Sequence, residues 1–516
     1  SSGINKIAVK IENPMTIQFK IKKKVAYSDD SDVLEGAKFS ITSTASNKTS
    51  ILTTDKDGFC NIEEKYIEPG VYKYEITEIE SASKIYNNIL DGYKIIAYIK
   101  LNSAGGITFV ADENGTPLIS EPLMQRYYVY KGNTAIGSTA EGQKIKNLIQ
   151  LGQQNGDIPT AILTVGNTIE YKVDLVKLDS ESKAINRVNF EVKRDGNTIF
   201  NKMVSDDPND IEITESNMTP GTYTYYITET DVNNLLGVYV NVFKNKAIKV
   251  YTKLSADGTL TVVNDDSGNK FAIYSIDGNG NYTLLDRSDE AYKYVKDITV
   301  YKNGDGVSVL KVEVKDPTKY KVKIFKYNAE KISTKGSKFT VIQQDSTGKI
   351  STLLNNDYLR DVEINPAEAG NYIYYITENS TPTNNNSKPG AQYVNVLKGK
   401  YMKVYVHLDA NGRLSITNSK FQVADNYYEI YKGDISKRDG TKVENSEFIS
   451  VNVSGPQNNV YTLNVVVTNP VKINTNIIKK DTSNNDLASS HFKVRRQDVS
   501  TKTFSDRFEG EVTSGT

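Results

Sequence analysis

The stretch "PGTYTYYITETD" (Pro220 to Asp231) decides how the chain is interpreted, because it occurs three times in slightly different form. The earlier copy is "PGVYKYEITEIE" (Pro69 to Glu80) and the later one is "AGNYIYYITENS" (Ala369 to Ser380). The glutamates that close the copies lie 151 and 149 residues apart, at Glu78, Glu229 and Glu378. A fixed period of this kind indicates repeated domains, and 516 residues agree with about three domains of about 150 residues each.

Composition narrows the possible functions. The chain has 63 basic and 63 acidic residues, and this balance favours neither nucleic acid nor an anionic membrane as a partner. No apolar run approaches the roughly 18 residues of a membrane span, and the opening "SSGINKIAVK" lacks the apolar region of a signal peptide. One cysteine (Cys60) excludes an internal disulfide and a cysteine-built zinc site. The two histidines, His407 and His491, lack companions for a metal site, so we expect neither metal nor cofactor.

Alternating runs rich in Val, Ile, Thr and Tyr, separated by Gly, Asn and Asp turns, follow one another along the chain, which is typical of β-hairpins. We therefore predict an all-β protein, a tandem array of immunoglobulin-like antiparallel β-sandwich domains. The expected repeats are residues 15–167, 168–317 and 318–470. Residues 1–14 resemble the closing strands and are interpreted as the last strand of a preceding repeat. Residues 471–516 are interpreted as the truncated start of a fourth.

Each opening strand has a lysine where the alternation predicts an apolar residue. In the first, Ile17, Phe19 and Ile21 share one face, and the next position on that face is Lys23. The other strands give Lys177, Lys326 and Lys479 in the same way. The closing strands end similarly, each ten residues before one of these lysines, with Asn13, Asn167, Asp316 and Asn469. In the repeated phrase, Tyr74 and Ile76 place Glu78 on their own face, and Glu229 and Glu378 are placed alike.

Each full repeat thus directs one lysine, one glutamate and one Asn or Asp toward its core. The predicted trios are Lys23, Glu78 and Asn167; Lys177, Glu229 and Asp316; and Lys326, Glu378 and Asn469. A single strand lysine is usually solvent-exposed, and a strand-terminal Asn is usually a turn residue. Repetition in one register favours burial instead. Asn264 and Asn418, which end an earlier strand, are alternative partners; the first repeat has Ala111 at that position, which favours the later set.

Burial of such a trio would change its chemistry. Low dielectric lowers the pKa of a lysine and raises that of a glutamate, so the lysine becomes a neutral nucleophilic amine. A protonated glutamate can hydrogen-bond the Asn side-chain carbonyl and relay a proton to the leaving group. The expected product is an amide between the two side chains, with release of ammonia from Asn or water from Asp. The reaction occurs once per domain, so the protein is not a turnover enzyme.

The lysine near the end of the first strand, the phrase "GTYTYYITE" and the ending "VVVTNP" resemble the isopeptide-forming domains of Gram-positive pilins and surface adhesins. These are the collagen-adhesin B-type domains and the related streptococcal T-antigen major-pilin domains. The family's Lys-x-Asp opening is matched at Lys177 and Lys479 but not at Lys23 and Lys326. The resemblance implies Lys–Asn or Lys–Asp isopeptide bonds, the latter at Asp316, with the three glutamates as catalytic residues.

The resemblance also implies a place and a role. We expect a structural stalk of a bacterial cell-surface adhesin or pilus, extracellular and anchored to the cell wall through regions outside this sequence. The expected partners are neighbouring repeats, other pilin subunits or host surface ligands. One rival is an adhesive module that binds a host protein or glycan through its loops, which predicts one repeat with a distinctive loop or exposed aromatic cluster. The other rival, an enzyme, is disfavoured by the scarcity of histidine and cysteine.

Overall fold

The structure is a computed structural model, and it divides into two compact units. The first comprises residues 1–319, 365–369 and 410–412, and the second comprises 320–364, 370–409 and 413–516. The structure describes the whole chain apart from residues 1–13, 119–126, 155, 186–187, 204–210, 233–237, 329–330, 382–392, 458–459, 472–476, 486, 488–489, 498–503 and 513–516. Within the described residues, three β-sandwich-like domains of two sheets each follow one another, as predicted.

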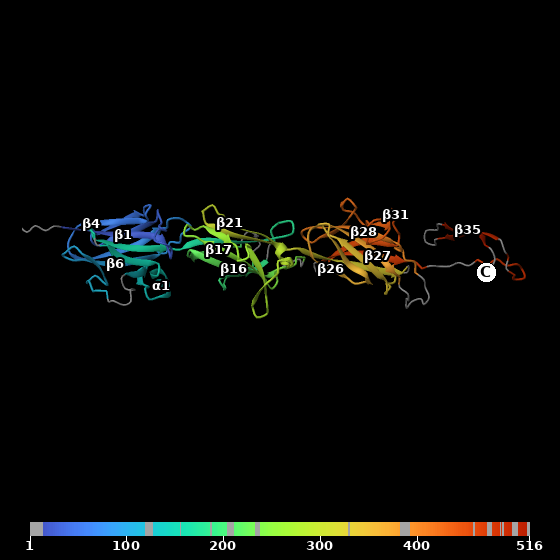
Figure 1. Ribbon diagram of the computed structural model, residues 1–516, viewed down its shortest axis with the longest axis horizontal. Helices are drawn as coiled ribbons and strands as arrows, with labels where there is room; N and C mark the ends of the chain where they lie inside the picture. The colour runs from blue at the N-terminus through green and yellow to red at the C-terminus, as the bar shows by residue number, and fades with distance from the viewer. Residues whose placement is uncertain are drawn as a thin grey trace, which may run out of the picture. The chain divides into compact units, whose positions relative to one another are not determined.

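The first repeat consists of a four-stranded and a seven-stranded sheet (Figure 1). The four-stranded sheet has the order β10-β11-β1-β4, from Ile149–Gln154, Thr160–Asn167, Met15–Val25 and Phe59–Ile67. The other has the order β3-β2-β5-β6-β8-β9, from Lys48–Thr53, Lys38–Ser43, Gly70–Glu80, Tyr93–Leu101, Tyr128–Lys131 and Thr134–Ala135. Strand β7 (Ile107–Val110) pairs with β6, and the short helix α1 spans Ala140–Lys146.

The second repeat has the same arrangement. Its four-stranded sheet is β15-β12-β22-β21, from Glu212–Met218, Ile169–Leu178, Ser308–Lys315 and Val295–Lys302. Its larger sheet is β14-β13-β16-β17-β19-β20, from Asn197–Met203, Val188–Arg194, Gly221–Val232, Lys246–Leu254, Phe271–Ile276 and Tyr282–Leu284. Strand β18 (Leu260–Val263) pairs with β17, and a 3-10 turn, η2, spans Glu290–Tyr294.

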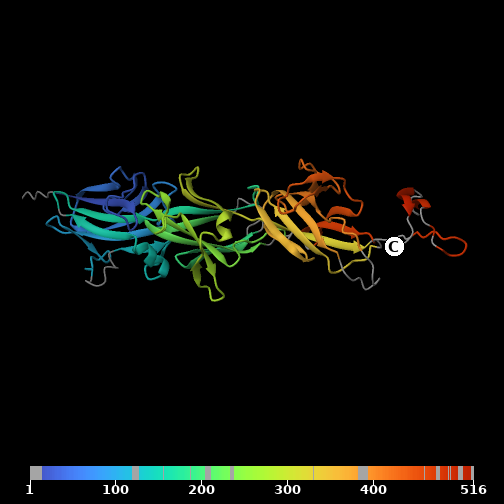
Figure 2. The same cartoon turned by 45° about the vertical axis from the view of Figure 1, so that its right-hand side comes forward.

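The third repeat, yellow to red in Figures 1 and 2, repeats this pattern. Its four-stranded sheet is β26-β23-β33-β32, from Val362–Ala367, Thr318–Asn328, Val460–Asn469 and Ile449–Gln457. Its larger sheet is β25-β24-β27-β28-β30-β31, from Ile350–Tyr358, Lys338–Gln344, Gly370–Ser380, Lys400–Leu408, Glu429–Lys432 and Thr441–Val443. Strand β29 (Leu414–Thr417) pairs with β28; β34 (Ser490–Gln497) and β35 (Phe504–Val512) form a separate hairpin.

One strand pair in each repeat departs from the antiparallel pattern. The first and last strands of the repeat lie side by side and run parallel: β1 with β11, β12 with β22, and β23 with β33. Alternation along a strand is the same in parallel and antiparallel pairs, so periodicity did not reveal this. The consequence is geometric, because parallel strands end at the same edge of the sheet. Val25 lies opposite Asn167, and Asn328 lies opposite Asn469.

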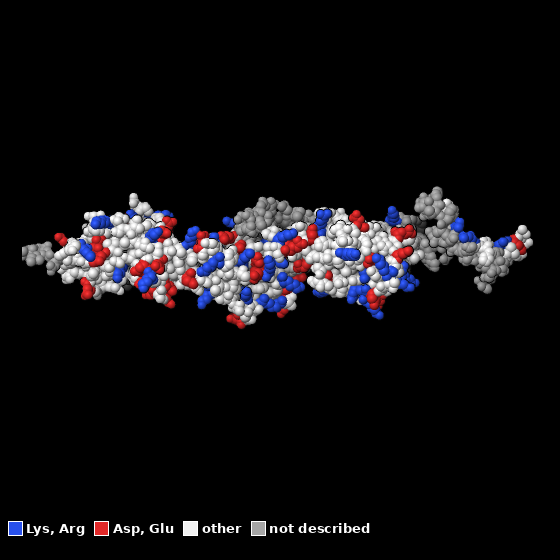
Figure 3. Space-filling view, turned by 90° about the horizontal axis from the view of Figure 1, so that it is seen from above, with Lys and Arg blue, Asp and Glu red and all other residues white. Residues whose placement is uncertain are grey.

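The alternation of each opening strand places its apolar residues in the core. Ile17, Phe19 and Ile21 are each at most 1% exposed, and Lys23, two positions further on, is 0% exposed. The surface differs from the core: Lys and Arg side chains are intermixed with Asp and Glu over the face seen in Figure 3. Among the described residues, the structure contains no helix with the length and apolar character of a membrane span.

Candidate functional site

The first trio meets where β1 and β11 end. Lys23 Nζ donates to Glu78 Oε2 at 2.7 Å and also to Asn167 Oδ1. Asn167 Nδ2 donates in turn to Glu78 Oε1 at 2.9 Å, which closes a triangle of hydrogen bonds. All three residues are at most 1% exposed. The lysine therefore has no contact with water and depends on these two partners.

The second trio contains two acids and no amide. Lys177 Nζ lies 2.5 Å from Glu229 Oε2 and 2.6 Å from Asp316 Oδ1. All three residues are again at most 1% exposed. Glu229 Oε1 and Asp316 Oδ2 are buried and have no hydrogen-bond partner within the described part of the chain. This repeat thus places an amine directly against the carboxyl group that the sequence proposes as its partner.

The third trio consists of the same residue types as the first, and its hydrogen bonds are longer. Lys326 Nζ donates to Glu378 Oε2 at 3.1 Å. Asn469 Nδ2 donates to both carboxyl oxygens of Glu378, at 3.1 Å each. Asn469 Oδ1 is buried without a hydrogen-bond partner in the described residues. The three residues are at most 3% exposed, so this site is also closed to solvent.

A phenylalanine forms an apolar wall beside each glutamate. Across the ladder between the second strand and the glutamate strand, each glutamate pairs directly with a buried phenylalanine: Phe39 with Glu78, Phe190 with Glu229, and Phe339 with Glu378. Lys23 Nζ also lies 5.5 Å from the Phe39 ring centroid. Sequence reasoning did not assign these residues a role, although the second strands "GAKFSIT", "RVNFEVK" and "GSKFTVI" share them. A low-dielectric wall of this kind strengthens the electrostatic interactions inside the site.

The ladder is interrupted immediately after each glutamate. The register between β2 and β5 shifts between Lys38 and Phe39, so that Lys38 pairs with Glu80 and Phe39 with Glu78. The same shift occurs in the other two repeats beside Phe190 and Phe339. A β-bulge bends its strand and re-aims the neighbouring side chain. Each glutamate is thus the last regularly paired residue before a bulge.

The pKa of the lysine is lowered in the first and third sites and raised in the second. Burial lowers the pKa of Lys23 to about 8, although the negative charge of Glu78 opposes it. Lys326 behaves alike: burial lowers its pKa to about 8 against the charge of Glu378. For Lys177, burial acts in the same direction, but the charges of Asp316 and Glu229 outweigh it and raise the pKa. Burial and the nearby charge of Glu229 raise the pKa of Asp316 well above its ordinary value, against the effect of Lys177.

The glutamate contacts differ in one respect from the sequence prediction. We expected a protonated glutamate to donate to the Asn side-chain carbonyl. In the first and third sites the glutamate instead accepts a hydrogen bond from the Asn amide nitrogen and another from the lysine. One carboxyl group therefore bridges the attacking nitrogen and the nitrogen that would leave. This is suitable geometry for moving a proton from one nitrogen to the other.

The remaining sequence candidates lie elsewhere. Asn418 forms its own turn, accepting from the backbone N–H of Lys420 and Gln422 and donating to the Gln422 side chain at 3.0 Å. Asn264, the other alternative partner, is exposed just after β18. Lys479 is exposed, and Asn13 lies outside the described residues. Of the positions considered, the structure brings together the nine residues of the three predicted trios.

Comparison with known proteins gives one family and several similar structures. Residues 17–115 match the SpaA family, described as a prealbumin-like fold domain. No curated protein matches the sequence. The pilus adhesin SpaC from Lactobacillus rhamnosus GG, in its open conformation, is similar at 10% identity over 90% of this chain and 44% of that chain, with a TM-score of 0.22. The Bacillus anthracis TIE protein is similar at 14% identity over 71% of this chain and 46% of that chain, with a TM-score of 0.21.

A third similar structure is BcpA, the major pilin subunit of Bacillus cereus, at 12% identity over 89% of this chain and 100% of that chain, with a TM-score of 0.22. The chain spans less than half the length of the SpaC and TIE structures. The family match falls on the first repeat, whose sheets and strand order recur in the other two. In keeping with the resemblance to Gram-positive pilin and adhesin domains that the sequence indicated, residues 17–115 match the SpaA family of prealbumin-like fold domains.

Proposed function

We propose that each repeat forms an intramolecular isopeptide bond, joining Lys23 to Asn167, Lys177 to Asp316, and Lys326 to Asn469. One observation carries this proposal. In each of the three repeats a buried lysine amine contacts a buried glutamate, and the side chain of the Asn or Asp lies against one or both of them. Such a lysine costs stability unless it is paired or changed chemically. Amide formation removes its charge permanently.

The reaction balances in both versions. In the first and third repeats the neutral lysine amine attacks the Asn Cγ, a C–N bond forms, and the bond from Cγ to Nδ2 breaks. The glutamate accepts a proton from the lysine nitrogen and donates it to the leaving nitrogen, so ammonia departs and the glutamate is regenerated. In the second repeat the lysine nitrogen replaces a carboxyl oxygen of Asp316, and water departs. Contact between the reacting groups in the folded protein supplies a large share of the rate, up to about 7–11 kcal/mol.

The position of the bond defines a path for mechanical load. A pulling force that enters at the start of β1 reaches Lys23, crosses the bond to Asn167 and leaves directly into β12, which begins at Ile169. Residues 24–166 lie off this covalent path. A tandem array of such domains suits a stalk in a cell-surface adhesin or pilus. The intact mass of the denatured protein tests the bonds: each reacted Asn lowers it by one ammonia, and the reacted Asp by one water.

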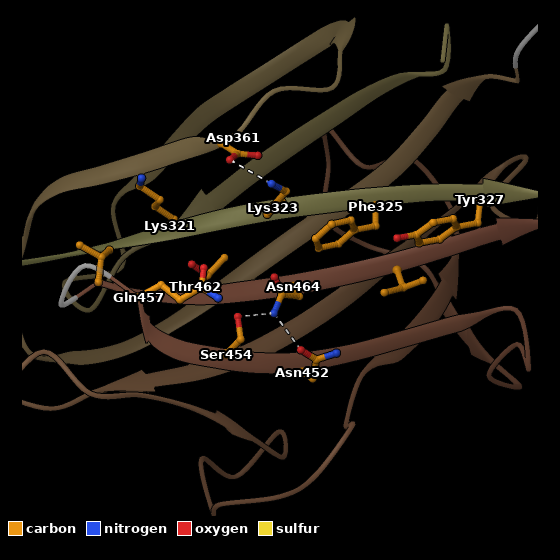
Figure 4. Close-up of a pocket in the computed structure, with 12 residues that line it drawn as sticks. Lys321, Lys323, Phe325, Tyr327, Asp361, Asn452, Ser454, Gln457, Thr462 and Asn464 are labelled. Carbon is orange, nitrogen blue, oxygen red and sulfur yellow. Dashed lines mark hydrogen bonds and ion pairs between the residues drawn. The ribbon is translucent and has the colours of Figure 1, made fainter. Parts of the chain in front are cut away.

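A second candidate function rests on a groove in the third repeat. The groove has a volume of about 450 Å³ and lies on the outer face of the four-stranded sheet, over β23, β33 and β32 (Figure 4). Phe325 and Tyr327 lie side by side along β23, with ring planes within 6° of parallel and centroids 6.2 Å apart. The aligned positions are Lys22 and Lys24 in the first repeat and Val176 and Leu178 in the second. The aromatic pair is therefore particular to the third repeat.

The polar lining of the groove favours a neutral oligosaccharide. Asn464 Nδ2 donates to Asn452 Oδ1 and Ser454 Oγ, at 2.8 Å each, beside the aromatic pair. Lys323 pairs with Asp361 at 3.3 Å and Lys321 with Glu363 at 4.0 Å, so each lysine of the groove already has an acidic partner. Aromatic rings offer apolar surface to the carbon faces of a sugar, and amides and hydroxyls can donate to and accept from sugar hydroxyls. The groove lies on a sheet face, whereas the sequence suggested loops.

Calorimetric titration of the chain with a panel of neutral oligosaccharides tests this second function. We expect at least one to bind, and the double substitution Phe325→Ala and Tyr327→Ala to abolish binding. Val176→Ala, at the aligned position of the second repeat, is the matched control and should leave affinity unchanged. Binding that survives the double substitution, or that is confined to acidic glycans and weakens with salt, would rule out a neutral-sugar groove here.

A further inference from the structure

The loop that follows each glutamate strand contains a second repeated motif, Tyr-x-Asn-x-Leu or Phe. Its copies are "YNNIL" (residues 86–90), "YVNVF" (239–243) and "YVNVL" (393–397). The motif asparagines are separated from their glutamates by 10, 12 and 17 residues. The spacing to the following strand is constant instead. The last residue of the motif always precedes a buried strand residue by five positions: Leu90 precedes Ile95, Phe243 precedes Ile248, and Leu397 precedes Met402.

The asparagine side chain makes the same two contacts in every repeat. Its Nδ2 donates to the main-chain carbonyl of the catalytic glutamate: Asn88 to Glu78 at 2.8 Å, Asn241 to Glu229 at 3.2 Å, and Asn395 to Glu378 at 2.7 Å. Its Oδ1 accepts from the backbone N–H two residues further on, at 3.0, 2.9 and 2.8 Å. The pinned carbonyl lies beside the bulge, where the strand ladder is interrupted.

The residue before the asparagine reaches the other reacting strand. The backbone N–H groups of Asn87, Val240 and Val394 donate at 2.9, 2.8 and 2.9 Å to the carbonyls of Thr168, Pro317 and Pro470. Each of these carbonyls belongs to the residue directly after the Asn or Asp of the trio. The motif tyrosine forms an isolated β-bridge with the next residue along that chain segment, as Tyr86 does with Ile169. One short loop therefore holds the end of the glutamate strand and the end of the closing strand together.

The last residue of the motif is buried in every repeat. Leu90, Phe243 and Leu397 are at most 1% exposed. In the second repeat, Lys177 Nζ lies 5.4 Å from the Phe243 ring centroid. The motif thus touches the glutamate, the strand of the electrophile and, through Phe243, the lysine.

We propose that Asn88, Asn241 and Asn395 are positioning residues for the cross-linking reaction, an inference that rests on the proposed isopeptide bonds. Each asparagine fixes the main chain of the glutamate relative to the closing strand. In the first and third repeats this keeps the glutamate carboxyl group against the lysine nitrogen and the Asn amide nitrogen. In the second repeat it keeps the carboxyl group of Glu229 against Lys177 and Asp316. The contacts are retained although the loops differ in length. A misplacement of about 1 Å can slow a positioned reaction about 100-fold.

The test follows bond formation and folding separately in one chain. Protein isolated in the unfolded, unreacted state is refolded by dilution, samples are quenched in acid, and each bond is quantified by peptide mass spectrometry. Tyrosine fluorescence follows folding in the refolding mixture before the quench, since the chain has 34 tyrosines and no tryptophan. Asn88→Asp keeps the acceptor for the Leu90 N–H and removes the donor to Glu78. Ile89→Val is the matched control, because the other repeats have valine at that position.

We expect Asn88→Asp to slow the Lys23–Asn167 bond by about 10- to 100-fold while folding and the other two bonds keep their rates. Ile89→Val should leave all rates unchanged. Asn241→Asp gives the same test in the second repeat should the first variant fail to fold. Equal slowing of folding and bond formation would make the asparagine merely structural, and an unchanged bond rate would remove its role. Absence of bonds in the wild-type chain would overturn the proposed function itself, a separate outcome.

Discussion

Lys177 Nζ lies 2.6 Å from Asp316 Oδ1, at the end of the parallel strands β12 and β22, with both side chains at most 1% exposed. The corresponding partner in the other repeats is a neutral amide, at Asn167 and Asn469. This single difference adds a negative charge to the site, and the two acids together raise the lysine pKa that burial alone would lower. The second repeat therefore provides an internal comparison for the chemistry of the other two.

Replacing Asp316 by Asn should convert the second site to the chemistry of the other two. Removing the Asp316 charge should bring the pKa of Lys177 down, because burial then faces only the charge of Glu229. We expect faster bond formation, with ammonia released in place of water. An isopeptide bond made from Asn or Asp is the same group, so the reacted wild type and the reacted Asp316→Asn variant should have identical intact masses. Masses that differ by the difference between Asp and Asn would mean that the second site does not react in either chain.

Bond formation in the first and third repeats should accelerate as pH rises. The reactive lysine is the deprotonated one, and the pKa of Lys23 and Lys326 is about 8. Below that pH the neutral fraction grows about tenfold per pH unit, and above it the rate should level off. Because the pKa of Lys177 is raised instead, the rate in the second repeat should keep rising above pH 8 and level off only at higher pH. Refolding from the unreacted state at a series of pH values, with each bond quantified over time, checks this; parallel profiles for all three bonds would contradict it.

Loss of one bond should lower the stability of its own repeat. Glu78→Ala removes the proton relay, so Lys23 and Asn167, which are 144 residues apart in the sequence, stay without a covalent link. Closing a loop of that length restricts the unfolded chain and, by analogy with disulfides, contributes about 5 kcal/mol. The denaturation midpoint of the first repeat should fall accordingly. Glu80→Ala is the control, because Glu80 is exposed and its ion pair with Lys38 lies at the surface, where such pairs contribute little. Equal midpoints for the two variants would argue against the bond.

Mechanical extension should distinguish the cross-linked repeat from its variant. In the wild type, residues 24–166 are bypassed by the bond between Lys23 and Asn167, so pulling on the chain should not release them. In Glu78→Ala, unfolding of the first repeat should release the segment between Lys23 and Asn167. These residues are 144 apart in the sequence, which gives about 50 nm of chain at about 3.6 Å per residue. Single-molecule force spectroscopy measures this release directly. A step of that length in the wild-type chain would contradict the proposed load path.

Much of the site followed from the alternation of side chains along strands. Lys23, Glu78 and Asn167 each continue an apolar face, and the structure brings the three together. The parallel pairing of β1 with β11 was not predictable, because both orientations share one periodicity. The role of Phe39 depends on its register opposite Glu78, which a bulge shifts. The role of Asn88 was not predictable from the period, because the number of residues between the asparagine and the glutamate differs among the repeats.

The intact mass of the denatured wild-type chain, compared with its sequence mass, tests the central claim most directly. Each glutamate acts in its own repeat, so Glu229→Ala should restore only the water lost in the second. For the wild type we predict a deficit of two ammonia molecules and one water molecule, from Asn167, Asn469 and Asp316. A measured mass equal to the sequence mass would mean that the three lysines are free amines and would contradict the account.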